Sequence, residues 1–280
     1  MEARALLIEA LDARWKKFRA ELKHCREEFS EEAVHDLRVA TRRLLAIFDL
    51  LRAIIPHNRI QKVRRELKDQ LDDLDDLRDT QALLADISEY LHEHPPLKLF
   101  QDHLLKEEKQ LMRLARKLVR AREHTRLNKR VEKIQTMVQL LNSETLPGQM
   151  VAVADEVFAR VMQACLAMDA SSPASIHKLR IAFKRFRYTL EVIHPLLPNF
   201  PPANFERMQA YQACMGDIQD MEVASQRVTE LDDASPSDLE AVSAHYASRL
   251  RMAILTFLED KGEALVFWRA SPEQLFPWEK

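Results

Sequence analysis

The stretch Val34–Asp49 reads VHDLRVATRRLLAIFD, and Ile176–Glu191 repeats its pattern as IHKLRIAFKRFRYTLE. Equivalent positions are separated by a constant interval, so that Arg38 in the first copy matches Arg180 in the second. That interval is about half of the chain, and repetition at a fixed interval indicates one structural unit used twice. The sequence therefore predicts an internal duplication.

Each copy has the period of an amphipathic helix with cations along one face. At roughly 100° per residue, the basic positions of the second copy fall within about 80° of one another, opposite the apolar positions. The basic positions are His35, Arg38 and Arg42 in the first copy, and His177, Arg180, Lys184 and Arg187 in the second. An exposed helix face normally alternates acids with bases, whereas these positions hold no acid. Because neighbouring cations repel one another, we expect an anionic ligand here; an ordinary solvated face is the alternative.

The paired motifs VHDLRVATRRL and IHKLRIAFKRFRYTLE resemble the CHAD domain, the conserved histidine α-helical domain. The resemblance covers nearly the whole chain, and it implies an all-helical, internally duplicated fold that binds inorganic polyphosphate along a basic central channel. The chain departs from the family pattern in a further pair of segments, LDDLRD at 74–79 and MGDIQD at 215–220. There Asp75 replaces a glycine and Gln219 replaces an arginine, which weakens any role for Arg78 or Asp79.

The composition is typical of a helical globular protein. Of 280 residues, 46% are hydrophobic, 31% are charged and only three are glycine. So few glycines argue against β-hairpins and against the glycine-rich loops that hold nucleotide phosphates. A net charge of −2 argues against a general nucleic-acid coat and favours a local basic cleft for a defined anion.

The cysteines and the apolar runs bear on the cellular compartment. Cys25, Cys165 and Cys214 are far apart and odd in number, which favours reduced thiols over a disulfide framework or a structural zinc site. No run approaches the roughly 20 apolar residues of a membrane span, and the N-terminal segment lacks the apolar core of a signal peptide. We expect a cytoplasmic protein without membrane contact, and the resemblance adds association with polyphosphate granules.

Turn-forming clusters divide the chain into segments. Residues 142–148, NSETLPG, form the clearest turn, so we predict one half at 1–145 and a second half at 146–280. Periodicity predicts helices at 2–28, from Ser30 to about 55, at 59–92, from Pro95-Pro96 to about 141, and at 149–170, 174–194, 203–232 and 237–260. The fourth is compatible with a break near His124–Thr125. The predicted fold class is all-α, with two four-helix bundles related by a pseudo-twofold axis.

Ten side chains on the two motif helices are the predicted polyphosphate ligands, because arginine forks and lysine point charges both suit phosphate oxygens. They are His35, Arg38, Arg42, Arg43, His177, Arg180, Lys184, Arg185, Arg187 and Tyr188. Arg43 and Arg185 are expected at the rim of the stripe, and packing at a helix interface is the alternative for Tyr188. Leu45 stands at the position that matches Arg187, so the second half is predicted to bind more strongly. A further extension of the groove would comprise Lys62, Arg65, Arg113, Arg116 and Arg120, with a solvent-facing surface as the alternative.

Charge on the two histidines would strengthen binding at lower pH. The alternative for each histidine is a buried hydrogen bond. We predict that His35→Ala/His177→Ala would lose the pH dependence if the histidines touch the ligand.

Two other functions are compatible with parts of the sequence. In a metal-dependent phosphohydrolase or a phosphoryl-transfer accessory, the paired histidines would hold metal or accept a phosphoryl group, but the adjoining arginines disfavour a divalent cation. Nucleic-acid binding would need aromatic or amide side chains beside the cations, and the stripes carry almost none. We therefore predict a non-catalytic protein without cofactor or metal. Its predicted partner is polyphosphate, with a polyphosphate-metabolising enzyme as a second partner to consider.

The acids at 72–76 have a similar pair of interpretations. Asp72, Asp73, Asp75 and Asp76 would suit a metal ion, but solvent exposure or pairing with Arg78 explains them adequately.

Overall fold

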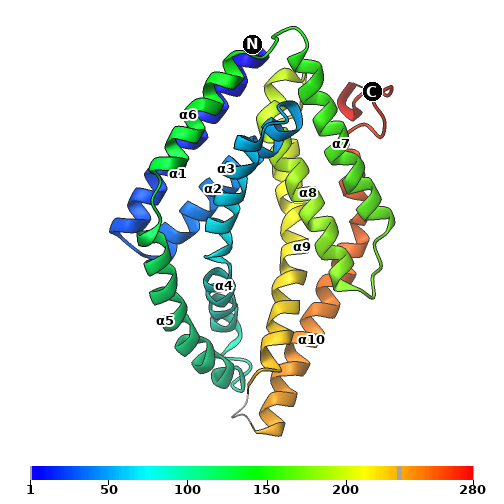
Figure 1. The fold of residues 1–280 in the computed structure, drawn as a ribbon. Coiled ribbons are helices and arrows are strands. Elements are labelled where there is room, and N and C mark those ends of the chain that lie inside the picture. The colour runs from blue at the N-terminus through cyan, green and yellow to red at the C-terminus, as the bar shows by residue number, and fades with distance from the viewer. Residues whose placement is uncertain (1, 232–234, 280) are drawn as a thin grey trace.

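The computed structural model describes residues 2–231 and 235–279, and every regular element within them is a helix (Figure 1). The α-helices of the first half are α1 (Ala3–Glu27), α2 (Glu31–Ile54), α3 (Asn58–Asp72), α4 (Asp75–Tyr90), α5 (Leu97–Ala121) and α6 (Thr125–Gln139). Those of the second half are α7 (Leu146–Leu166), α8 (Pro173–Ile193), α9 (Ala203–Val228) and α10 (Pro236–Glu259). Three short 3-10 helices follow α8 and α10: η1 (His194–Leu196), η2 (Lys261–Val266) and η3 (Pro277–Glu279). The predicted all-α class is confirmed.

Local sequence signals set the ends of the two motif helices, α2 and α8. The Ser30 side chain accepts a hydrogen bond from the Ala33 backbone N–H at 3.2 Å and caps the start of α2. Pro56 follows the last turn of α2 and cannot continue it. Helix α8 begins at Pro173, whose fixed φ suits a first turn. Both helices therefore lie within a few residues of their predicted bounds.

Two of the long helices predicted for the first half are divided. The segment predicted at 59–92 ends at Asp72 and resumes at Asp75, with Leu74 (φ −113°, ψ 1°) outside helical geometry. Leu74 is nevertheless buried, in phase with the leucines on either side, so the apolar spacing concealed the break. The next predicted helix is divided between α5 and α6, close to the break that the sequence allowed at His124–Thr125.

Two hydrophobic cores run through the molecule, and each takes side chains from both halves. The larger core joins α1, α2, α3 and α6 to α7 and α8. The smaller core lies where α4 and α5 meet α9 and α10, in the lower part of Figure 1. It includes Phe100 and Tyr246, whose rings are 5.9 Å apart in an edge-on arrangement. Both cores contain residues from either side of residue 145, so they mark no boundary there. The division into halves at 145 stays a prediction.

The motif helices α2 and α8 pack against each other. Two ion pairs cross their contact: Arg43 Nε lies 3.8 Å from Glu191 Oε2, and Arg185 Nη2 lies 3.9 Å from Asp49 Oδ1. In the repeat, Arg43 matches Arg185 and Asp49 matches Glu191, so each half offers the same pair to the other. A twofold axis between equivalent surfaces produces this reciprocal exchange, which agrees with the predicted duplication.

Candidate functional site

Five cationic side chains gather beside the contact of α2 with α8. We call them the cationic site: Arg38, Arg42, Arg78, Arg180 and Lys184. Each lies within electrostatic range of at least two of the others. Four carboxylates from α4 and α9 lie within electrostatic range of these cations: Asp75, Asp79, Asp217 and Asp220. The sequence showed no acid along either stripe, so this partial neutralisation arises only in the folded molecule.

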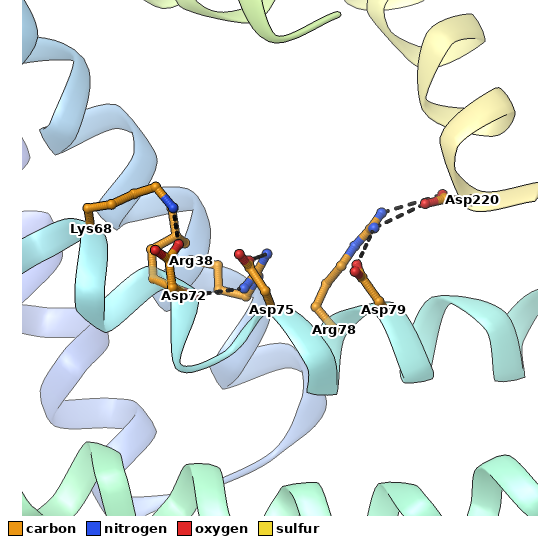
Figure 2. A network of polar contacts seen from close by, with 8 residues as sticks. Arg38, Lys68, Asp72, Asp75, Arg78, Asp79 and Asp220 are labelled. Atoms are coloured by element: carbon orange, nitrogen blue, oxygen red, sulfur yellow. Dashed lines mark hydrogen bonds and ion pairs between the residues drawn. The ribbon is translucent and has the colours of Figure 1, made fainter. Parts of the chain in front are cut away.

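Arg38 is the most deeply buried cation of the site, with 3% of its surface exposed. Its Nη1 donates to the Leu71 carbonyl oxygen in the last turn of α3 at 3.2 Å, and its Nη2 lies 2.7 Å from Asp75 Oδ1 (Figure 2). A helix-terminal carbonyl and a carboxylate together satisfy a buried guanidinium. Groups of the protein itself therefore satisfy the Arg38 guanidinium. Asp75 pairs with this residue, not with Arg78 as the sequence suggested.

The neighbouring acids of this segment also have partners other than Arg78. Asp72 pairs with Lys68 (Figure 2), and Asp73 accepts a hydrogen bond from Arg122 Nε at 2.9 Å. Both ion pairs lie at the α3 end of the break, and the Arg38–Asp75 pair lies at its α4 end.

Arg78 links the two halves of the chain. Its Nη1 donates to Asp79 Oδ1 at 2.9 Å and to Asp220 Oδ1 of α9 at 3.1 Å (Figure 2). Burial disfavours the charge on Arg78, but the two carboxylates outweigh burial and raise the pKa of the guanidinium. The matching position in the second half is Gln219, so a single arginine serves both acids. In the sequence, the departures from the family pattern at Asp75 and Gln219 weakened any role for Arg78, and its partner on a distant helix could not be seen.

Arg180 lies against α9 at Gly216. A β-carbon at Gly216 would stand 3.8 Å from Arg180 Nε, in ordinary van der Waals contact. In the first half, the position that matches Gly216 holds Asp75, which pairs with Arg38. Equivalent arginines thus meet a glycine in one half and a carboxylate in the other. Burial lowers the pKa of Arg180, although Asp220 acts in the opposite direction.

Arg42 and Lys184 have the most strongly lowered pKa values of the cationic site. Burial, followed by the positive charge of Arg38, lowers the pKa of Arg42 to about 10. Burial, followed by the charges of Arg42 and Arg180, lowers the pKa of Lys184 to about 7. Cations crowded together away from water destabilise one another's charge. An anion bound here would relieve both effects.

Several buried nitrogens in this region lack a hydrogen-bond acceptor within the part of the chain that the structure describes. They are the Nε atoms of Arg42, Arg180, Arg185 and Arg187, together with His177 Nδ1. An unsatisfied buried polar group costs roughly 1–3 kcal/mol, and such groups are uncommon in folded proteins. All five belong to predicted site residues. Arg42 and Arg180 belong to the cationic site, whereas Arg185 and Arg187 lie beside the contact of α2 with α8. Oxygens of a bound anion would supply acceptors to such groups.

A second group of charged side chains surrounds the α2–α8 contact. This crossing cluster consists of two acids, Asp49 and Glu191, and seven arginines: Arg14, Arg43, Arg52, Arg64, Arg160, Arg185 and Arg187. Its arginines outnumber its carboxylates by far. Arg187 also lies over the Tyr188 ring at 5.0 Å, and Tyr188 is within electrostatic range of Arg42 and Arg180. The crossing cluster therefore adjoins the cationic site.

Four arginines of the crossing cluster were not predicted from the sequence: Arg14, Arg52, Arg64 and Arg160. They come from α1, α2, α3 and α7, so no single helical stripe contains them. One signal was available, because Asp49 and Glu191 occupy matching positions at the ends of the two motif stretches.

The two predicted histidines differ in their surroundings. His35 is exposed near the start of α2, whereas His177 is half-buried on α8. Burial, followed by the positive charge of Arg180, lowers the pKa of His177. A histidine with a lowered pKa is neutral at pH 7 and offers a hydrogen bond rather than a charge.

The predicted extension is not gathered at α8. The Arg116 guanidinium lies over the Phe29 ring at 5.7 Å, and Arg120 Nη2 donates to the Arg26 carbonyl at 3.5 Å. Lys62 lines a separate cavity between α3 and α6, and Arg65 and Arg113 are exposed on α3 and α5. Their participation in the same groove stays a prediction.

Two further properties concern residues 2–231 and 235–279 only. Within these ranges, no three or more His, Cys, Asp or Glu side chains are grouped so that they would hold a metal ion. None of the helices described there is long and apolar enough to cross a membrane.

The chain belongs to the CHAD domain family, because the family's CHAD domain pattern matches residues 9–229. Two solved structures share its fold. The crystal structure of the CHAD domain from the plant Ricinus communis superimposes with a TM-score of 0.76 at 18% identity, covering 96% of this chain and 93% of that one. PptA from Streptomyces chartreusis has a TM-score of 0.74 at 16% identity, covering 95% and 99%. No curated protein matches the chain in sequence. The resemblance noted in the sequence is confirmed.

Proposed function

We propose that this protein binds inorganic polyphosphate at the cationic site without turning it over. The main support is that the buried Nε atoms of Arg42 and Arg180 have no acceptor among the described residues, beside Lys184, whose charge is disfavoured. Phosphate oxygens would supply acceptors to Arg42 and Arg180, and their negative charge would restore the charge on Lys184. Ligand binding would thus remove costs that the folded protein carries when empty.

A linear polyanion fits this arrangement better than a single phosphate. A basic face of seven helical residues is about 10 Å long, enough for several phosphate units. The crossing cluster adjoins the cationic site through Arg187 and Tyr188, so we infer that the path of the chain continues there. Together the two groups would form the basic channel that the family resemblance implies. Ten predicted ligands, from His35 to Tyr188, are proposed as its lining.

We further propose that the second half makes the stronger contacts. Asp75 already occupies Arg38, whereas Arg180 meets Gly216 and has a free Nε. Arg187 adds a cation that the first half lacks, since Leu45 stands at the matching position.

Polyphosphate binding would also determine where the protein is found in the cell and which partners it has. A cytoplasmic protein that binds polyphosphate would associate with polyphosphate granules or with an enzyme that makes or degrades the polymer. Granule association in cells would distinguish the first role, and co-purification with such an enzyme would distinguish the second.

The test is calorimetric titration with long-chain polyphosphate, with orthophosphate and single-stranded DNA as comparison ligands, at low and physiological salt. We expect tight binding of the long chain alone, weakened at least tenfold in Arg180→Ala/Lys184→Ala. The matched control is Lys106→Ala/Lys109→Ala, which removes two exposed cations from α5. Equal weakening in both variants would mean general electrostatic attraction, and equal affinity for DNA would mean a nucleic-acid binder. Release of phosphate above background would point to an enzyme.

A further inference from the structure

A cavity of about 340 Å³ lies between α3 and α6, away from the contact of α2 with α8. Its lining residues are His57, Asn58, Arg59, Lys62, Lys129, Arg130 and Lys133. Five of these seven residues are arginine or lysine, and none is acidic or apolar. We propose that this cavity is a second anion site, which takes a short run of phosphate units independently of the cationic site.

The charges of the cavity are scarcely neutralised. Within the described part of the chain, the one ion pair of its lining residues joins Arg130 Nη1 to Glu66 Oε2 at 2.6 Å. By contrast, four carboxylates lie within electrostatic range of the five cations of the cationic site. The α3–α6 cavity therefore has the larger excess of positive charge. Its lysines are exposed, so water screens their mutual repulsion more than in the buried cationic site.

The packing of α3 against α6 holds these repelling side chains in place. Below the cavity, Ile60 and Val63 of α3 and Val131 and Ile134 of α6 are fully buried in the larger core. On the surface, Arg59 and Lys62 are three residues apart along α3, and Lys129 and Lys133 are four apart along α6. Like charges at these spacings disfavour a helix. The packed core nevertheless fixes the two helices so that the basic residues of both line the same cavity.

Uncharged groups of the cavity also suit an anion. The first turn of α3 lies at its edge, where backbone N–H groups and the helix dipole favour negative charge. His57 Nδ1 accepts a hydrogen bond from the Arg59 backbone N–H at 3.0 Å, so a neutral His57 carries its proton on Nε2. That proton is then available to an oxygen in the cavity.

The lining points to phosphate units rather than to a larger molecule. Nucleotides and single-stranded nucleic acid need apolar or aromatic surface on which a base can stack, and His57 is the only ring among the lining residues. Lysine ammonium groups and two arginine forks recognise compact, multiply charged oxyanions. Two such sites on one molecule would let it hold a short phosphate in addition to a long chain, or hold two parts of one chain.

Tripolyphosphate is the probe, titrated at physiological salt into Arg180→Ala/Lys184→Ala, in which the cationic site is weakened. We expect one equivalent to bind. Adding Lys129→Glu/Lys133→Glu should weaken that binding about tenfold or more. Adding Lys106→Glu/Lys109→Glu instead, with the same charge change on exposed positions of α5, should change it less than about twofold.

Absence of tripolyphosphate binding, or an equal loss in the two charge-reversed proteins, would overturn the second site. The proposed function is tested separately, because it predicts that Arg180→Ala/Lys184→Ala alone weakens long-chain binding. If only Lys129→Glu/Lys133→Glu weakens the long chain, the cationic site is not the receptor and the α3–α6 cavity is. Circular dichroism and thermal unfolding of each protein would show whether the fold is retained.

Discussion

Arg38 and Asp75 form an ion pair with 2.7 Å between Nη2 and Oδ1, and this pair has no counterpart in the second half as far as the structure describes it. There the matching residues are Arg180 and Gly216, and the arginine side chain lies against α9 at the glycine, which has no side chain to pair with it. In the part of the chain that the structure describes, Arg38 thus has a carboxylate at the matching position and Arg180 does not, although Asp79 and Asp220 lie within electrostatic range of Arg180. The difference comes from a single position, so it can be tested by a single substitution.

We expect Asp75→Asn to strengthen polyphosphate binding about three- to fivefold, because it removes one negative charge from beside the site while keeping an acceptor for Arg38. The same change should lower the free energy of unfolding by about 1–2 kcal/mol, because the buried guanidinium loses its charged partner. Calorimetry and urea denaturation measure the two effects. The control is Asp76→Asn, an equal charge change at an exposed position. Equal gains in both variants would show that only total charge matters.

Polyphosphate affinity should rise as the pH falls, with Lys184 as the main cause. Its pKa of about 7 in the free protein should increase when an anion binds, so that binding takes up a proton. Between pH 8 and pH 6, the affinity for a long chain should rise up to about tenfold. Lys184→Arg keeps the charge at all these pH values and should flatten the profile. An unchanged profile in that variant would exclude Lys184 as the titrating group.

The lowered pKa of Lys184 also predicts how stability changes without ligand. A lysine side chain has an ordinary pKa of 10.5 in the unfolded chain, and the folded protein lowers the pKa of Lys184 to about 7. Between these values the unfolded chain binds more protons than the folded protein, so the free energy of unfolding should rise with pH through this interval. Denaturation curves at pH 7 and pH 9 measure the rise. Lys184→Met should reduce it, and a fall in stability with pH would contradict the lowered pKa.

The histidines should make a smaller contribution than the sequence suggested. His177 has a lowered pKa, caused first by burial and then by Arg180, so it gains charge only below its ordinary range. We expect His35→Ala/His177→Ala to keep most of the affinity change between pH 8 and pH 6. Loss of that change would assign the pH dependence to the histidines instead. Titration of the His177 ring by NMR would show the pKa directly.

The sequence predicted the helical positions of the site better than their electrostatic surroundings. Periodicity placed Arg38, Arg180 and Lys184 on one face of each motif helix, because that information is local to a helix. It did not show that Asp75 would neutralise Arg38, because this contact depends on the break between α3 and α4. Arg78 was missed for a similar reason, since its partner Asp220 lies on α9. Contacts between distant helices are set by packing and leave no period in the sequence.

The smaller hydrophobic core provides a test of whether the two halves fold as one unit. Phe100 of α5 is fully buried there against Tyr246 of α10. Phe100→Ala should lower the free energy of unfolding by about 3–5 kcal/mol, because it leaves a cavity in a packed core.

If the two halves unfold as one unit, amide hydrogen exchange in Phe100→Ala should become faster in α9 and α10 as well as in α4 and α5. Leu127→Ala, in the larger core between α1, α3 and α6, is the matched control and should leave α10 protected. Faster exchange confined to α4 and α5 in Phe100→Ala would instead mean that the halves unfold independently. The division at residue 145 would then describe two domains, and the cationic site between them would lie at a domain interface.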